Sequence, residues 1–225
     1  MTSYVGSLHS QYPYSAVCEV VATFKDGASF QGSGVFVSAN DVLTASHMLW
    51  QTDHGGAATS VTVYAGRDGA SLPFGAHSAA QWNYYQINDH LDQISHSDAQ
   101  FDVGIISLAT NDRLGAQTGT FGMDPNAHSG NYILTGYPTG PDRMTNDSGY
   151  VKEDANYFTF DYQDFSSHPG SSGGPLWYLG AAGPYVVGVC SGGIMGGEWP
   201  MTAWAADISK TYAQLQAWIH QDGVW

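Results

Sequence analysis

Residues 168–176 read His-Pro-Gly-Ser-Ser-Gly-Gly-Pro-Leu, which places a serine among small residues that can form a tight turn. A nucleophilic serine needs such a turn, because its hydroxyl must be exposed while nearby backbone N–H groups converge on a developing oxyanion. Ser172 is the candidate nucleophile, and the N–H groups of Gly170 and Ser172 are the candidate oxyanion donors. Taken alone, the segment also fits an ordinary glycine-rich turn between two strands.

A candidate general base ends the segment Val-Leu-Thr-Ala-Ser-His at residues 42–47. An apolar strand leads through small residues to His47, and small neighbours leave room for a substrate beside the ring. The chain has nine histidines. A single one at the end of a strand is therefore weak support for a base until the other two segments are considered.

A candidate orienting carboxylate directly precedes the apolar run Val103–Leu108. If Asp102 is buried there, it can fix the tautomer of His47 and stabilise the protonated ring. The alternative is a solvated acid that caps a strand. Asp98 is a nearby competitor, but it does not adjoin the apolar run.

The elements that must position these residues are short strands. Runs rich in β-branched and aromatic residues, separated by turn signals such as Lys-Asp-Gly at residues 25–27, predict an all-β sandwich or barrel. The predicted strands are Ala16–Phe24, Gly34–Ser38, Val42–Ser46, Ser60–Tyr64, Val103–Leu108, Tyr132–Gly136, Tyr157–Tyr162 and Tyr185–Cys190. One long helix is predicted near the end of the chain, with Ser209 as its N-cap and Gly223 as its stop.

Composition narrows the range of partners. The 225 residues include 43% hydrophobic ones, which indicates a folded globular protein, and only six Lys plus Arg against a net charge of −14. Nucleic acid and anionic membrane surfaces are therefore poor partners. No apolar run approaches the length of a membrane span. The two cysteines, Cys18 and Cys190, are no disulfide framework, and we expect them to remain unpaired.

The three segments occur together in the order His, Asp, Ser. The runs Leu43–His47, Phe101–Ile105 and Gly170–Leu176 resemble the three signature blocks of the trypsin-like (chymotrypsin-fold) serine peptidases. Tyr185–Gly193 resembles the strand that in this family lines the primary specificity pocket and pairs with the substrate backbone. The resemblance covers nearly the whole chain.

The resemblance implies two six-stranded antiparallel β-barrels with a His47, Asp102 and Ser172 triad at their junction. We expect residues 1–225 to form one peptidase unit, with barrels at 15–108 and 125–208 and a C-terminal helix at 209–222. The implied activity is hydrolysis of internal peptide bonds through an acyl-enzyme. No cofactor or metal is implied. We expect a secreted monomer that acts on polypeptides, and we expect its signal peptide not to be present in this chain.

The same resemblance suggests which residues bind the substrate, and Ser191 is also expected to help hold Asp102. The candidate substrate-binding residues are Ser167, His168, Cys190, Ser191, Gly192 and Gly193.

Two departures from the usual family pattern point to bacterial members, including the glutamyl endopeptidase branch. The usual disulfides are missing, and Ser171 stands where the family usually has an Asp before the nucleophile. We therefore expect neutral hydrogen bonds around Ser171 to hold the oxyanion turn. The glutamyl endopeptidase branch places a His in the pocket, where this chain has Cys190.

Two other functions share these residues. One is a non-catalytic binding protein on the same scaffold, although such relatives usually lose a triad member. The other is an esterase or acyl transferase that uses the same triad. An α/β-hydrolase is disfavoured, because its His must follow the Ser and the only later one is His220.

A polar stretch with several potential metal ligands precedes Asp102. His90, Asp92, His96 and Asp98 lie there without the rigid spacing of a metal-binding motif. We interpret this stretch as a solvated loop.

Overall fold

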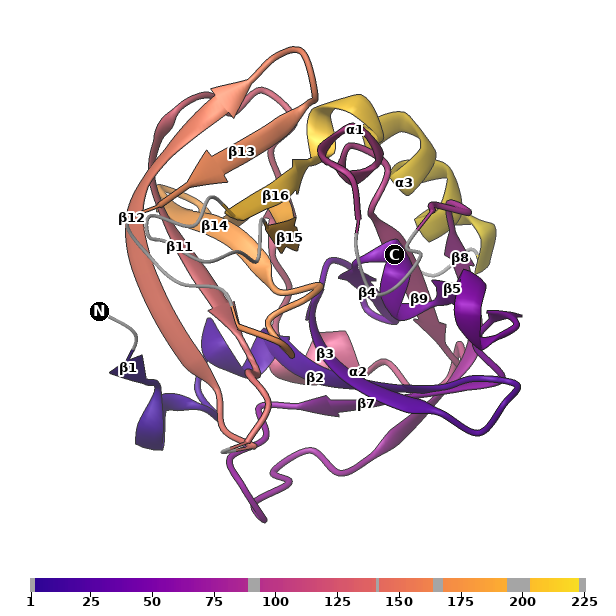
Figure 1. Cartoon of the computed structure of the whole chain (residues 1–225). Coiled ribbons are helices and arrows are strands. Elements are labelled where there is room, and N and C mark those ends of the chain that lie inside the picture. Colours follow the sequence, from indigo (N-terminus) through magenta and orange to yellow (C-terminus); the bar gives the residue numbers. More distant parts are fainter. Residues whose placement is uncertain (1–2, 89–93, 141, 164–167, 194–202, 223–225) are drawn as a thin grey trace.

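The computed structural model describes residues 3–88, 94–140, 142–163, 168–193 and 203–222. Strands dominate this part of the chain and form two barrels that lie against each other (Figure 1). The expectation of an all-β protein built from two six-stranded antiparallel barrels, with a helix near the C-terminus, is confirmed.

The first barrel closes in the order β2-β3-β4-β9-β8-β7. Its strands are β2 (Val17–Thr23), β3 (Ser29–Phe36), β4 (Asp41–Thr44), β7 (Ser60–Ala65), β8 (His77–Tyr84) and β9 (Gly104–Leu108). Every residue of β9 is buried, as its apolar sequence requires. The predicted turn between β2 and β3 forms around Gly27, whose φ of 90° favours glycine.

The second barrel has the order β12-β11-β14-β15-β16-β13 and closes because β12 also pairs with β13. Its strands are β11 (Gly130–Gly136), β12 (Thr145–Asp154), β13 (Thr159–Tyr162), β14 (Pro175–Gly180), β15 (Gly183–Gly193) and β16 (Ala203–Asp207). Two short strands extend this sheet: β1 (Ser3–Tyr4) pairs with β12, and β10 (Gly122–Met123) runs parallel to β15.

The remaining elements are small. They are β5 (Trp50–Gln51), β6 (Gly56–Ala57), α1 (His96–Ala99), α2 (Leu114–Thr118), α3 (Tyr212–Ile219) and short 3-10 turns. None of the described helices is long and apolar enough to cross a membrane.

The C-terminal helix begins later than the sequence indicated. The carboxylate of Asp207 accepts the N–H of Ser209 at 2.8 Å, and this bond caps a 3-10 turn at Ile208–Lys210. The α-helix then begins after Thr211, so Ser209 lies inside the preceding turn and is not its N-cap. Leu215, Trp218 and Ile219 are the buried face of α3, which lies along β9 of the first barrel (Figure 1).

Four of the barrel strands, β8, β12, β14 and β16, were not predicted. The longest, β12, reads Thr-Asn-Asp-Ser-Gly-Tyr-Val-Lys-Glu-Asp and lacks the apolar alternation of a half-buried strand. It is extended because β11 and β13 pair with it on both sides. β8 similarly leaves most of its residues partly exposed, so tertiary pairing outweighs its weak local preference.

The two cysteines lie in separate hydrophobic clusters. Cys18 is fully buried in the core of the first barrel, whereas Cys190 belongs to the core of the second. Both thiols are free, which confirms the expectation that they do not pair. Burial, together with the neighbouring charge of Glu19, raises the pKa of the Cys18 thiol well above its usual range.

Candidate active site

His47 lies on a short 3-10 turn, Ser46–Met48, that directly follows β4. Ser46 anchors this turn: its hydroxyl donates to the carbonyl of Val103 at 2.8 Å and accepts the N–H of Tyr85 at 2.8 Å. The histidine side chain is 14% exposed. β4 and β9 are paired neighbours, so the first barrel alone fixes the distance between His47 and Asp102.

Asp102 is fully buried and its carboxylate is satisfied by three donors. Oδ1 accepts the backbone N–H of His47 at 2.9 Å, and Oδ2 lies 2.7 Å from Nδ1 of the same ring. The hydroxyl of Ser191, from β15 of the second barrel, donates to Oδ2 at 2.5 Å. A carboxylate at Nδ1 favours the tautomer with its proton there, which places the ring's accepting lone pair on Nε2.

The turn that carries Ser172 requires two glycines. Gly170 has φ 90° and Gly173 has φ 83°. A Cβ on Gly170 would lie 2.4 Å from the carbonyl oxygen of Tyr137, and one on Gly173 would lie 2.2 Å from that of Ser33. Any side chain at either position would therefore displace the turn.

Neutral hydrogen bonds hold this turn on its second-barrel side. Ser171 donates its N–H to the carbonyl of His168 at 2.8 Å, and its hydroxyl accepts the N–H of His168 at 3.3 Å. Thr139 donates its N–H to the carbonyl of Pro169 at 2.7 Å. These contacts agree with the expectation that neutral bonds around Ser171 stabilise the turn.

Ser33, to which the sequence analysis assigned no role, holds the same turn from the first barrel. Its fully buried hydroxyl donates to the carbonyl of Gly170 at 2.7 Å and accepts the N–H of Tyr137 at 2.8 Å. Its N–H donates to the carbonyl of Ser172 at 2.7 Å. The only sequence signal is its place in the small-residue run Gly-Ser-Gly at 32–34, which gives no partner.

These contacts bring the three segments together at the junction of the barrels. A Cβ on Gly32 would lie 2.5 Å from Sδ of Met48 and 2.9 Å from the carbonyl oxygen of Ser172. Gly32 therefore lies between the turn of His47 and the turn of Ser172. On the other side, Gly173 donates its N–H to the carbonyl of Cys190 at 2.8 Å.

The candidate oxyanion donors have no protein acceptor among the described residues: neither the N–H of Gly170 nor that of Ser172 donates a hydrogen bond there. Their carbonyls, in contrast, are both bonded to Ser33. Buried N–H groups are ordinarily paired. Two N–H groups that lie beside a serine and have no acceptor in the described part of the chain match an arrangement that can bind a developing oxyanion.

The end of β15 contains four of the candidate substrate-binding residues. Cys190 is 2% exposed and its Sγ lies 3.6 Å from the hydroxyl of Tyr162, so it faces the second core. Ser191 contacts Asp102. Gly192 and Gly193 are partly exposed, and both pair with β16.

The other two candidates lie apart from β15. His168 is exposed and borders a hollow of about 450 Å³. The other residues around this hollow are Ser3, Tyr4, Pro138, Thr139, Thr145 and Pro169. Ser167 lies outside the described residues, as does the stretch 194–202.

Of the four potential ligands in the polar stretch before Asp102, the structure describes His96 and Asp98, and these two have different partners. His90 and Asp92 lie outside the described residues, and the N–H of Asp98 donates to the hydroxyl of Ser95 in the capping bond of α1. His96 contacts Asp161 of the second barrel.

A partly buried ion pair joins β2 of the first barrel to Arg67. Glu19 on β2 is 1% exposed and pairs with Arg67, which also reaches Asp142 of the second half at 3.4 Å. Burial raises the pKa of Glu19 although Arg67 opposes the shift. Burial also raises the pKa of the nearby Tyr137 hydroxyl well above its usual value, so this group stays neutral.

Comparison with known proteins identifies the family and the fold. The family described as "Trypsin-like peptidase domain" matches residues 32–189. The solved structure of the protease Anisep from Arthrobacter nicotinovorans has a TM-score of 0.72 at 22% identity, over 90% of this chain and 96% of that one. A Glu endopeptidase structure has a TM-score of 0.72 at 19% identity, over 96% and 95% of the two chains.

A curated relative matches a shorter part of the chain. The protein named extracellular metalloprotease of Bacillus subtilis (strain 168) is 31% identical over 100 residues, which are 44% of this chain and 30% of the relative. The chain thus spans less than a third of that relative's length in the match. The family match covers far more of the chain, including the segments of all three candidate residues. On that match the chain belongs to the trypsin-like peptidase family, whose enzymes are serine endopeptidases.

Proposed function

We propose that the chain hydrolyses internal peptide bonds through an acyl-enzyme, with Ser172 as nucleophile, His47 as general base and Asp102 as the residue that orients the base. The observation that carries this proposal is the buried carboxylate of Asp102, which is bonded to the backbone N–H and the ring Nδ1 of His47 and to the hydroxyl of Ser191. A buried carboxylate is retained where its charge is used or fully satisfied.

The proposed first step forms a bond between Oγ of Ser172 and the carbonyl carbon of the substrate. Nε2 of His47 takes the proton of the hydroxyl, and the carbonyl electron pair moves onto its oxygen. The N–H groups of Gly170 and Ser172 then stabilise that oxyanion. Their carbonyls are bonded to Ser33, whereas their N–H groups have no acceptor among the described residues, and this difference supports the role.

The intermediate collapses when the C–N bond breaks, and His47 returns its proton to the leaving amine. A water molecule then repeats the sequence on the ester: His47 takes a proton from the water, and Ser172 leaves with that proton. Protons balance over the cycle, so the two steps require no cofactor.

The substrate is proposed to be an extended polypeptide that pairs with the β15 edge at Ser191, Gly192 and Gly193. Ser191, Gly192 and Gly193 carry no charge, which favours an uncharged side chain before the cleaved bond. Cys190, a candidate from the sequence, faces the second core and is not proposed to contact the substrate. Ser167 and His168 complete the proposed contacts. The net charge of −14 gives no basic surface for nucleic acid or anionic membranes, and we propose that the protein is a monomer. We also propose that it acts outside the cell, which is the location that the curated relative's name gives for that protein.

An active-site probe tests this proposal against a binding protein on the same scaffold. A fluorophosphonate should label the protein once, and peptide mapping should locate the label on Ser172. The Ser172→Ala variant should not react, and its kcat should fall by about a millionfold. Ser171→Ala is the matched control, because its hydroxyl is buried in the turn and should not be the labelled group.

Failure to label the wild-type chain, or near-parental turnover by Ser172→Ala, would refute the assignment. Cleavage of a peptide library then separates a peptidase from an esterase or acyl transferase. A peptidase should cut internal bonds of the library, whereas an esterase should hydrolyse small esters and leave the peptides intact.

A further inference from the structure

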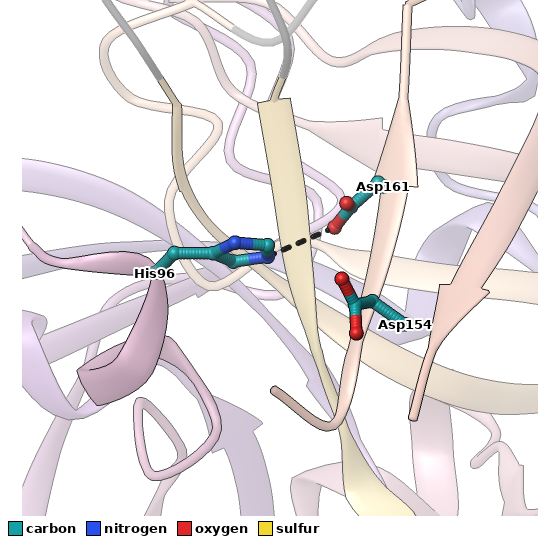
Figure 2. Close-up of side chains that lie close together, drawn as sticks. All are labelled: His96, Asp154 and Asp161. Carbon is teal, nitrogen blue, oxygen red and sulfur yellow. Dashed lines mark hydrogen bonds and ion pairs between the residues drawn. The ribbon is translucent and has the colours of Figure 1, made fainter. Parts of the chain in front are cut away.

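Three potential metal ligands meet where the chain before Asp102 reaches the second barrel. His96 opens α1, Asp154 ends β12 and Asp161 lies on β13 (Figure 2). One ligand atom from each lies within 4.8 Å of the others, and all three side chains are partly buried. The site lies apart from the residues proposed to react with the substrate.

The register of the hairpin explains why the two carboxylates converge. Asp154 pairs directly with Thr159 across β12 and β13, so these two side chains share a face of the sheet. Asp161 follows Thr159 by two positions and therefore points to the same face. Figure 2 shows the imidazole of His96 reaching this face from the other half of the chain.

The imidazole is held in place by two aromatic rings. The ring of His96 stacks on Tyr157 with centroids 4.3 Å apart and on Trp204 with centroids 4.6 Å apart. The two interplanar angles are 26° and 25°, so the ring is enclosed on both faces. Its Nε2 contacts Oγ1 of Thr159 at 2.8 Å and Oδ1 of Asp161 at 3.1 Å. Little side-chain entropy remains to be lost when this nitrogen binds a ligand.

The charges at this place favour a cation. Among the described residues, no Lys or Arg pairs with Asp154 or Asp161, and the sole ion-pair partner there is His96. A single imidazole therefore faces two carboxylates. The backbone N–H of Asn156 binds Oδ1 of Asp154 at 2.9 Å and orients that carboxylate.

We propose that His96, Asp154 and Asp161 bind one divalent transition-metal ion of the Zn²⁺ type. Imidazole nitrogen and carboxylate oxygen bind Zn²⁺ at about 2.0–2.2 Å, which places the ligand atoms of a tetrahedral site roughly 3.3 Å apart. Small side-chain rotations bring the observed cluster to that spacing, and water supplies the fourth ligand. The imidazole argues against Ca²⁺, which prefers six or more oxygens.

The bound ion would link α1 to the β12–β13 hairpin. It would thereby attach the segment that precedes Asp102 to the second barrel. Asp102 lies six positions beyond His96, and its N–H donates to the carbonyl of Ala99 at the end of α1. The ion's role is therefore structural. Its binding should raise the melting temperature, because it binds the folded chain and not the unfolded one.

Calorimetric titration of the full chain with ZnCl₂ after chelator dialysis tests the proposal. The titration is made in a His47→Gln background, so that the candidate catalytic imidazole cannot bind the ion. We expect one Zn²⁺ per chain and a raised melting temperature. His96→Ala and Asp154→Asn should each weaken Zn²⁺ binding at least tenfold, because even the loss of a residue that only hydrogen-bonds to a metal ligand typically has that effect.

His128→Ala is the matched control and should bind Zn²⁺ like its parent. His128 pairs with Glu153 at 2.9 Å close to the same hairpin, but it is 80% exposed and belongs to no such cluster among the described residues. In Asp154→Asn, the new side-chain oxygen can still accept the backbone N–H of Asn156, so we expect this variant to fold. It therefore tests the site even if His96→Ala fails to fold. Absence of saturable Zn²⁺ binding, equal binding by Asp154→Asn, or equal affinity for Ca²⁺ would overturn the proposal.

Discussion

Two imidazole–carboxylate pairs of nearly equal length lie in different regions of the first barrel. At the barrel junction, Nδ1 of His47 lies 2.7 Å from Oδ2 of Asp102; on the outer face, Nδ1 of His77 lies 2.8 Å from Oδ2 of Asp112. Asp102 is fully buried, whereas Asp112 is 21% exposed. The nitrogen–oxygen distances of the two pairs are nearly equal, so any difference in chemical behaviour between the pairs must come from their surroundings.

The difference lies in what occupies the remaining atoms. At His77 the second ring nitrogen contacts the carbonyl of Phe74 at 2.7 Å, so both nitrogens face acceptors. Burial alone would lower the pKa of His77, but the bonds to Asp112 and Phe74 outweigh it and raise that pKa. The pair of His77 and Asp112 therefore favours the protonated ring. At the junction, three donors satisfy Asp102. In the proposed mechanism, Nε2 of His47 transfers the proton.

The largest expected effect separates the two carboxylates. Asp102→Asn should lower kcat by about ten-thousandfold near neutral pH, because the amide no longer fixes the reactive tautomer of His47. Asp112→Asn, which alters a pair of the same length, should leave kcat within about twofold. Steady-state kinetics on a peptide substrate measures both, and full activity of Asp102→Asn would remove the proposed role of the junction pair.

A second change tests whether the junction depends on both barrels. Ser33→Ala removes the hydroxyl that binds the carbonyl of Gly170 and the N–H of Tyr137. We expect kcat to fall about tenfold to a hundredfold with little change in KM, because the oxyanion donors shift. Urea unfolding should show a loss of about 1–3 kcal/mol, since buried groups lose their partner.

Ser29→Ala is the control for that change. Ser29 lies on the same strand, but its hydroxyl binds that of Thr23 at an exposed position. It should keep both kcat and stability. A Ser33→Ala enzyme with unchanged kcat and reduced stability would show that Ser33 supports the fold without positioning the turn.

The activity of the junction pair should depend on pH. A base must be neutral to accept a proton, and histidine side chains ordinarily lose theirs near pH 6.5. We expect kcat/KM to rise through roughly pH 6 to 7.5. A pH–rate profile measures this rise, and a maximum near pH 4 would be incompatible with His47 as the base.

The outer pair should show the opposite dependence, in stability and with the smallest effect. The folded pKa of His77 is raised above its unfolded value, so its contribution is complete below about pH 6.5 and is lost as pH rises through the folded pKa. Urea unfolding of the wild type and of His77→Gln should therefore differ more at pH 5.5 than at pH 8.5. A difference that grows with pH would contradict the raised pKa.

Much of the fold was predictable where burial leaves an apolar signature. β2, β4 and β9 are almost wholly buried, and their runs of Val, Ile and Leu indicated strands at nearly the observed positions. β12 was missed because its polar residues give no apolar alternation. Its conformation depends on pairing with β11 and β13, which the local sequence does not encode.

The sequence by itself determined the residue types that the proposed chemistry needs: a serine among glycines, a histidine after an apolar strand and an acid before one. These signals are local, because backbone conformation and burial act over a few residues. Tertiary structure alone decided that Ser33 and Ser191 cross between the barrels to hold Gly170 and Asp102. It also decided that His96 meets two carboxylates of a distant hairpin. Such contacts join residues 58 or more positions apart, and their geometry exists only once both barrels have closed.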